Sequence, residues 1–219
     1  MIPLRDFNPT SRRSLLTWGL IVINVAVYLY LSQNPVMDAD AIQRYALIPA
    51  DISAGRHLST LITSMFLHAS LLHVGGNMLF LWIFGNNVED RLGEIKFLAI
   101  YFAAGIAGSL LQVFINPTST IPNLGASGAI SGFLAAYVLY FPGARVLTFI
   151  APFFFVTLRA FVFIGYWIAL QALQAFLNIG VTGGGIAFFA HVGGFGAGLI
   201  LALLLRPARH PEPSLGYRL

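Results

Sequence analysis

The sequence contains no cysteine and very few charged residues. Without cysteine it has neither a disulfide framework nor a thiolate metal site, and cysteine usage gives no information on the compartment. Charged residues make up 9% of the 219 residues, whereas a soluble domain is about 25% charged. So few charges do not cover a water-exposed surface. The chain is therefore expected to use lipid as its outer solvent.

Apolar residues take the place of the missing charges. They make up 58% of the chain, and the mean hydropathy is +0.80. The net charge of +4 comes from only 12 basic residues. We interpret it as a signal for membrane orientation rather than as a nucleic-acid footprint, so no nucleic-acid partner is expected. At this length the chain holds one membrane domain in the lipid bilayer and little else.

Six apolar segments approach the roughly 20 residues that cross about 30 Å of hydrocarbon. The sequence therefore predicts an all-α polytopic membrane protein with a six-helix bundle over residues 17–205. A cytoplasmic N-terminal segment (1–16) and a cytoplasmic, disordered tail (206–219) flank it. The predicted spans are Thr17–Leu31, Leu71–Asn86, Phe97–Ile115, Ser127–Phe141, Ala160–Leu177 and Ile186–Leu205. We interpret the apolar stretch Arg145–Arg159 as an interfacial segment that leads into the fifth span.

The basic residues predict how these spans are oriented. With six spans, ten of the twelve basic residues fall on one face, and only Arg44 and Arg56 fall on the other. By the positive-inside rule the first face is cytoplasmic, so both termini are expected there. The second, fourth and sixth spans then all run from outside to inside.

Ser127 and His191 are polar residues that this layout brings to similar depth, near the outer surface. A polar side chain inside lipid is costly and usually functional, and the pair suggests a nucleophile with its base. Ser127 alone also fits a close-packed helix interface, because Gly128 follows it and Gly194 and Gly198 form a small-residue face on the partner helix. His191 alone also fits a residue that lines a pore or bridges helices.

His73 and Asn77 lie four residues apart in the first turns of the second span, so they share one helix face. With the Ser127 backbone N–H, they are suited to hold a developing negative oxygen. Asn77 also fits an ordinary hydrogen bond between helices. His68, just before the span, is expected to be structural.

Acidic residues are absent from the interior of the predicted spans. This excludes an intramembrane aspartyl protease, which needs paired carboxylates there, and disfavours a proton-coupled transporter. The His-Glu-x-x-His run of a zinc protease is also missing. No carboxylate is left to orient His191, so a serine hydrolase here would use a Ser–His dyad rather than a triad.

The polar motifs resemble those of the rhomboid family of intramembrane serine proteases. The resemblance covers nearly the whole chain, and its motifs are His68-Ala-Ser-Leu-Leu-His73-Val-Gly-Gly-Asn77, Val88-Glu-Asp-Arg-Leu-Gly93, Gly125-Ala-Ser127-Gly and Ala190-His191-Val-Gly-Gly194. It implies that Ser127 is the nucleophile, His191 the general base, and His73 and Asn77 the oxyanion hole. It further implies a six-helix core, cleavage of single-span membrane proteins near the outer face, and no cofactor.

Two positions depart from the family pattern. Ser59-Thr60 stands where many rhomboids have Trp-Arg, and Ser131 stands where some members have a tyrosine that packs on the catalytic histidine. Another group must therefore hold the His191 ring. The Gly183–Gly185 run is expected to be either a mobile lid or an ordinary turn.

Two alternatives to a protease use the same polar residues differently. One is a rhomboid-like protein that binds membrane clients without cutting them, and the other, less favoured, is a small channel or transporter. The compact chain is expected in a prokaryotic plasma membrane, with the active site toward the extracytoplasmic side. The residues define neither the substrate nor the oligomeric state.

Overall fold

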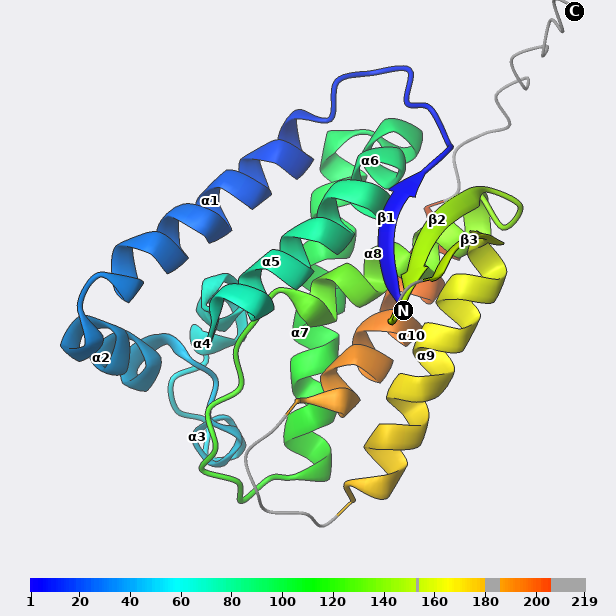
Figure 1. Cartoon of the computed structure of the whole chain (residues 1–219). Coiled ribbons are helices and arrows are strands. Elements are labelled where there is room, and N and C mark those ends of the chain that lie inside the picture. The colour runs from blue at the N-terminus through cyan, green and yellow to red at the C-terminus, as the bar shows by residue number, and fades with distance from the viewer. Residues whose placement is uncertain (153, 180–185, 206–219) are drawn as a thin grey trace, which may run out of the picture.

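The apolar runs of the sequence form the long helices of the structure (Figure 1). The computed structural model describes residues 1–152, 154–179 and 186–205. The expected tail 206–219 and the Gly183–Gly185 run lie outside these residues. Along the chain the elements are β1 (Ile2–Asp6), α1 (Leu15–Ser32), α2 (Pro35–Tyr45), α3 (Pro49–Ser53), α4 (Thr60–Thr63), η1 (Ser64–Phe66), α5 (Leu71–Phe80), η2 (Leu81–Gly85, a π-helical turn), α6 (Asn86–Leu92), α7 (Glu94–Ile115), α8 (Ser127–Tyr140), β2 (Arg145–Ile150), β3 (Phe154–Arg159), α9 (Ala160–Leu177) and α10 (Phe188–Leu204).

Three helices of the described residues, α1, α7 and α9, are long and apolar enough to cross a membrane. A fourth candidate joins the short segment Thr60–Phe66 to the run Leu71–Leu92 through a bend of 96°. The apolar helices α8 and α10 are shorter. The prediction of a mostly helical membrane protein is thereby confirmed. The second predicted segment ended at Asn86, whereas its helix continues through a polar turn to Leu92.

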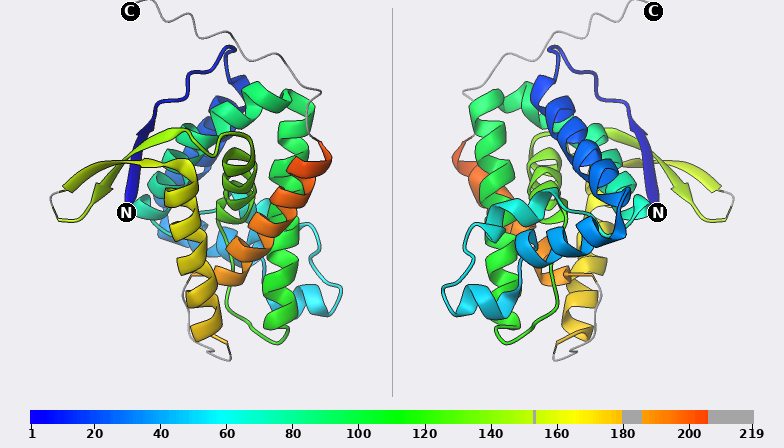
Figure 2. Two further views of the ribbon diagram at one scale, coloured as in Figure 1. Left: turned by 90° about the vertical axis from the view of Figure 1, so that its right-hand side faces the viewer. Right: turned by 90° about the vertical axis from the view of Figure 1, so that its left-hand side faces the viewer.

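Helix α8 lies at the centre of the bundle, with α7, α9 and α10 around it (Figure 2). Its residues from Gly128 to Tyr137 are all buried. Glycine and alanine along this stretch let neighbouring helices approach closely, and aromatic rings fill the remaining space. Phe133, for example, stacks on Phe97 of α7 with ring centroids 4.4 Å apart. The central position of α8 brings its first residue, Ser127, within reach of several other helices.

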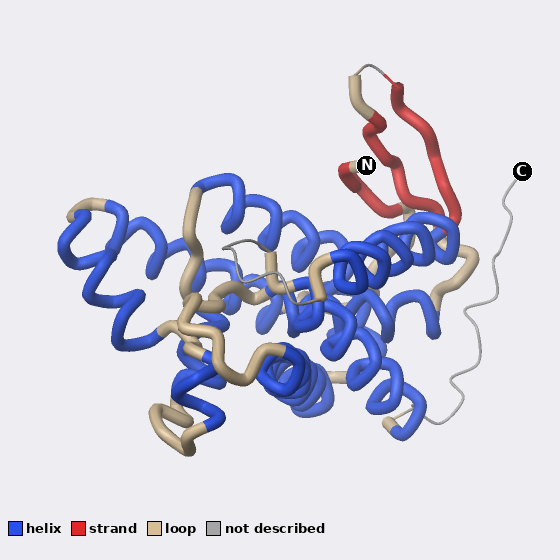
Figure 3. The backbone as a smooth tube through the Cα atoms, turned by 90° about the horizontal axis from the view of Figure 1, so that it is seen from below, coloured by secondary structure: helices blue, strands red, loops and turns tan. Residues whose placement is uncertain are grey.

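A three-stranded antiparallel sheet lies at the end of the bundle where α8 finishes and α9 begins. β2 and β3 form a hairpin, and β1 from the start of the chain pairs with the other edge of β2. Figure 3 shows the strands projecting to one side of the helices. The sequence predicted an interfacial segment at Arg145–Arg159 and no sheet. The hairpin was missed because its apolar run does not alternate with polar residues as a half-buried strand does.

Two acidic residues of α6 hold the start of α1. The Glu89 carboxylate accepts hydrogen bonds from the backbone N–H groups of Leu16 and Thr17 and from the Thr17 hydroxyl, at 2.7–3.0 Å. Asp90 accepts hydrogen bonds from the backbone N–H groups of Ser11 and Arg12. The Glu89 bonds satisfy N–H groups that the start of α1 leaves without intrahelical partners. The Asp90 bonds fix the segment that precedes α1.

Candidate active site

Ser127 is the first residue of α8, and the loop before it folds tightly against α5. Gly125 has a φ of +122° and donates its backbone N–H to the carbonyl of Ser64. A side chain at Gly125 would meet the His73 ring, because a Cβ there would lie 2.7 Å from His73 Nε2. Glycine therefore suits this position both for its backbone conformation and for space. The result is a serine hydroxyl held beside the first turns of α5.

His191 is the fourth residue of α10, and its ring reaches Ser127. The His191 Nε2 atom lies 2.7 Å from Ser127 Oγ, which is hydrogen-bonding distance. The imidazole is buried, with 8% of the residue exposed. The two residues that the sequence singled out therefore make direct contact, although 64 positions separate them in the chain.

Glycines bring α8 and α10 together at this point. A Cβ on Gly194 would collide with the backbone carbonyl of Gly128, and a Cβ on Gly198 would collide with the backbone of Gly132. Gly128, Gly194 and Gly198 therefore lie where the sequence placed them, in a contact between helix backbones. The packing interpretation and the nucleophile interpretation of Ser127 describe the same place, because close packing of these helices is what brings Ser127 to His191.

His73 and Asn77 enter the site from α5. Ser70 caps that helix by accepting a hydrogen bond from the backbone N–H of His73, and His73 Nδ1 accepts one from the backbone N–H of Ala69. The Asn77 Nδ2 atom is buried and has no hydrogen-bond partner among the described residues. An unpaired buried amide donor is costly. Its position beside Gly125 leaves it available to a group that enters from outside the protein.

Gln171 of α9 completes the surroundings of His191, and the sequence analysis did not identify it. Its Oε1 atom lies 2.7 Å from His191 Nδ1. The indole of Trp167, one turn earlier on α9, lies 5.9 Å from the imidazole between ring centroids, and Phe188 packs edge-on at 6.4 Å. A polar amide within the apolar run Ala160–Leu177 was the signal that could have found Gln171, because polar residues inside lipid are costly.

These side chains line one cavity of about 580 Å³. Its walls come from α5, α8, α9, α10 and the loop before α8, and they include His73, Asn77, Ser127, Gln171 and His191. Such a volume accepts an extended peptide segment of a few residues. His68 does not line it; its ring is buried and packs edge-on against His73 with centroids 5.0 Å apart.

The arrangement contains the parts that acyl transfer needs. Ser127 donates its hydroxyl proton toward Nε2 when the ring proton is on Nδ1, and Nδ1 then donates to Gln171 Oε1. The free Asn77 amide and the backbone N–H of Ser127 are donors for an oxygen that gains negative charge. A hydroxyl, an imidazole within hydrogen-bonding distance of it and amide N–H donors thus share one cavity.

Comparisons with known proteins agree on one family. A model of the Rhomboid domain matches residues 55–208. The mitochondrial Rhomboid protein 1 of Saccharomyces cerevisiae is 34% identical over 191 residues, which are 84% of this chain and 51% of that protein. The mitochondrial presenilin-associated rhomboid-like protein of Homo sapiens is 31% identical over 83% of this chain and 45% of its own. The rhomboid protease GluP of Bacillus subtilis is 45% identical over 76 residues, 35% of this chain and 14% of that protein. The chain thus spans about half the length of the mitochondrial relatives.

These matches correct the expected location. The sequence alone predicts a prokaryotic plasma membrane with the site on the extracytoplasmic side. The yeast and human relatives, which each match more than four fifths of the chain, are mitochondrial proteins. The expectation was wrong because hydropathy and charge bias indicate that a chain enters a bilayer, and which side its loops prefer, but do not identify the organelle.

Proposed function

Because this chain belongs to the rhomboid family, we propose that it is an intramembrane serine endopeptidase that cleaves single-span membrane proteins. The observation that carries the proposal is the 2.7 Å contact between Ser127 Oγ and His191 Nε2. It lies in a cavity that also holds the Asn77 amide, which is unpaired within the described part of the chain. A residue that only packs helices needs neither a base at its hydroxyl nor a free donor beside it.

In the proposed reaction, Ser127 Oγ attacks the scissile carbonyl carbon while His191 Nε2 takes the hydroxyl proton. The carbonyl oxygen becomes an oxyanion held by the Ser127 N–H, the Asn77 amide and His73. His191 then donates its proton to the leaving nitrogen, the peptide bond breaks, and an acyl-enzyme remains. Water hydrolyses that ester with His191 again acting as base, which restores Ser127.

The membrane layout that fits this chemistry has six crossings. They are α1, the run α5–α6, α7, α8, α9 and α10, with α8 enclosed by the others. Helix α8 begins at Ser127, and the cavity at this end of the helix gives water a route to the hydroxyl. The names of the yeast and human relatives favour a mitochondrial membrane for this chain.

Substrate choice is expected to depend on how easily the substrate helix opens at the scissile bond. A helical backbone hides its carbonyl groups in hydrogen bonds, so a transmembrane helix must open before Ser127 reaches the bond. Substrates with small, helix-destabilising residues near the cut are therefore expected to be favoured. If helix-stabilising changes near the cut leave the cleavage rate unchanged, this explanation of selectivity is wrong.

The test uses purified, detergent-solubilised protein and a model single-span substrate, with Ser127→Ala and His191→Ala as matched variants. Cleavage by the parent and by neither variant supports the proposal. Equal cleavage by all three indicates a contaminating protease and contradicts it. Absence of cleavage by folded parent protein over several substrates favours the client-binding function instead.

A further inference from the structure

Gln171 makes the second hydrogen bond of the His191 ring, on the side of the imidazole away from Ser127. It projects from α9 into the cavity one turn after Trp167. We propose that Gln171 is a positioning residue that keeps the ring proton on His191 Nδ1, so that Nε2 stays free to take the Ser127 proton. This inference rests on the proposed protease function.

The need for such a residue follows from the missing carboxylate. An imidazole has two nitrogens, and which one carries the proton is decided by the partner of the other. No carboxylate contacts His191 within the part of the chain that the structure describes. The amide oxygen of Gln171 accepts a hydrogen bond and thus selects the Nδ1–H tautomer. It does so as a neutral group, which suits a buried site because an unpaired carboxylate there is costly.

Ring contacts restrict His191 further. Trp167 lies beside the imidazole at an interplanar angle of 32°, and Phe188 meets it edge-on at 90°. Some rhomboids have a tyrosine that packs on the histidine where this chain has Ser131. Here Trp167 and Phe188 make the ring contacts instead. Ser131 instead donates its hydroxyl to the carbonyl of Ser127 at 2.6 Å. Trp167 and Phe188 therefore limit where the ring lies, and Gln171 determines its protonation pattern.

The experiment compares Gln171→Met, Gln171→Glu and the control Gln174→Met. Methionine approximates the glutamine volume without the acceptor, and Gln174 is exposed on the same helix. Gln171→Met should lower kcat on the order of 10–100-fold with little change in KM, because a misplaced catalytic group loses about that much rate. Gln174→Met should leave both constants unchanged. Gln171→Glu should retain more activity than Gln171→Met and shift the acid limb of the pH–rate profile to higher pH, since a carboxylate favours the imidazolium form.

A parallel measurement keeps the inference testable without proteolysis. The ¹⁵N chemical shifts of His191 distinguish a protonated Nδ1 from a protonated Nε2 in the full-length protein. The parent should show the Nδ1–H tautomer, and Gln171→Met should show a mixture. Unchanged tautomer and kcat in a folded Gln171→Met variant would overturn the positioning role. Absence of Ser127-dependent cleavage in the parent would instead overturn the proposed function, while the tautomer experiment would still decide the role of Gln171.

The hairpin of β2 and β3 carries a separate inference, which does not depend on catalysis. It extends sideways from the bundle at the level where α8 ends and α9 begins (Figure 2). Between Arg145 and Arg159 it contains no charged residue. Phe154 and Phe155 are each 67% exposed. Because neighbouring residues of a strand point to opposite faces, the start of β3 is uncovered on both faces at these two residues. A docked protein would cover one face, whereas lipid surrounds both.

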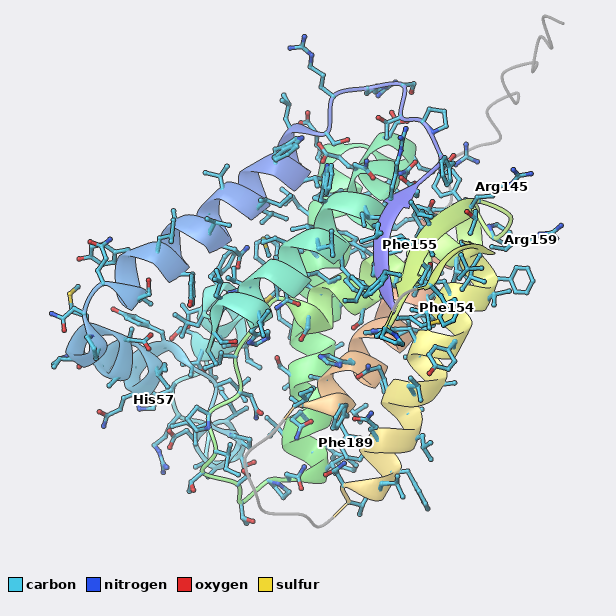
Figure 4. All side chains as sticks on the ribbon, in the orientation of Figure 1. His57, Arg145, Phe154, Phe155, Arg159 and Phe189 are labelled. Carbon is cyan, nitrogen blue, oxygen red and sulfur yellow. The ribbon has the colours of Figure 1, made fainter. Side chains whose placement is uncertain are left out.

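Arg145 and Arg159 face each other across the base of the hairpin, where they are paired in register. Like charges directly opposite each other destabilise a strand pair. Neither arginine has an ion-pair partner among the described residues. Figure 4 shows both side chains pointing away from the bundle. An anion between them would offset their repulsion, and the apolar tip places that anion at the surface of a hydrocarbon layer.

We infer that the hairpin binds an anionic phospholipid, with the phosphate between the two arginines and with Phe154 and Phe155 among the acyl chains of the same leaflet. Among the described residues no strand pairs with the outer edge of β3, and this edge limits the depth because unpaired backbone groups are not tolerated in the hydrocarbon core. The hairpin thus lies in the interface rather than across the bilayer.

The absence of cysteine makes this inference straightforward to test. Phe155→Cys carries a polarity-sensitive fluorophore in full-length protein reconstituted into phosphatidylcholine vesicles, with or without phosphatidylglycerol. The control is the same fluorophore on Ala39→Cys, because Ala39 is exposed between two aspartates. We expect the emission to be blue-shifted at residue 155 and not to be blue-shifted at residue 39. The shift should grow with phosphatidylglycerol, and Arg145→Gln with Arg159→Gln should abolish that growth. Water-like emission at residue 155 would overturn lipid insertion, and dependence on phosphatidylglycerol that survives loss of both arginines would overturn the headgroup site. Added inorganic phosphate should not reproduce the effect.

Discussion

Gly194→Ala is expected to separate the nucleophile from its base without altering either residue. A Cβ at Gly194 would collide with the Gly128 carbonyl oxygen and lie 2.8 Å from the carbonyl carbon. Ordinary contact begins at 3.4 Å, so α8 and α10 must part by at least 0.6 Å. The obstacle is helix backbone, which does not rotate away as a side chain does. Overpacking of this kind costs about 1–3 kcal/mol of stability.

The same shift reaches the active site at once, because Gly128 follows Ser127 and Gly194 lies one turn after His191. A movement of 0.6 Å would lengthen the 2.7 Å contact between Oγ and Nε2 to about 3.3 Å, beyond the usual length of such a hydrogen bond. The expected loss in kcat is on the order of 10²-fold.

Gly196→Ala is the matched control, because no atom of the described residues lies within 4 Å of a Cβ at that position of the same helix. The assay pairs cleavage kinetics with the thermal unfolding midpoint in one detergent. Gly194→Ala should be less stable and much less active than Gly196→Ala. If the two variants are equally active and equally stable, the close approach of the helices is not what holds Ser127 against His191.

Three further predictions concern other parts of the molecule. Asn77→Ala should lower kcat by about 10²–10³-fold with little change in KM, because an oxyanion donor acts mainly in the transition state; equal rates in a folded variant would exclude that role. Glu89→Ala should lower the free energy of unfolding by about 1–3 kcal/mol, because the substitution leaves the Thr17 N–H and hydroxyl without their acceptor. Denaturant titration measures this loss, and an unchanged unfolding midpoint would contradict the prediction. Burial raises the pKa of Asp6 above its ordinary value of 3.8, against the lowering effect of hydrogen bonds from Tyr137 and Asn87. The folded state then holds the proton more tightly than the unfolded state, so this group reduces stability as pH rises from about 4 upward. Asp6→Asn should remove this pH-dependent loss of stability. The unfolding midpoint of the variant should therefore rise relative to that of the parent as pH increases, and parallel midpoint curves for the two proteins would contradict a raised pKa of Asp6.

The helices could be predicted from the sequence because a segment that crosses lipid must satisfy its backbone internally, which favours a helix for an apolar run long enough to span the bilayer. The same solvent made the site visible: Ser127, His191, His73 and Asn77 are polar groups where polarity is costly. Matching depths along the predicted spans placed Ser127 and His191 at one level, and the structure adds their direct contact.

The missed features depend on contacts that no local pattern encodes. β1 pairs with β2, which lies far along the chain, and its five residues carry too short a pattern to indicate a strand. Gln171 stands on a helix whose other polar residues, such as Gln174, face outward, so only the fold distinguishes an amide at the base from one at the surface.

The strand pairing at the end of the bundle imposes a rule of parity on the protein. β1 and β2 are hydrogen-bonded, so the segments that contain Asp6 and Arg145 must lie on the same side of the membrane. The chain between them must therefore cross the bilayer an even number of times, whichever helices do so. A chain in which one of those helices fails to insert has an odd count and cannot form the first pair of strands. At a synthesis rate of about 5–20 residues per second, β2 is made several seconds or more after β1. The two strands then pair only in chains whose intervening helices have inserted into the membrane an even number of times.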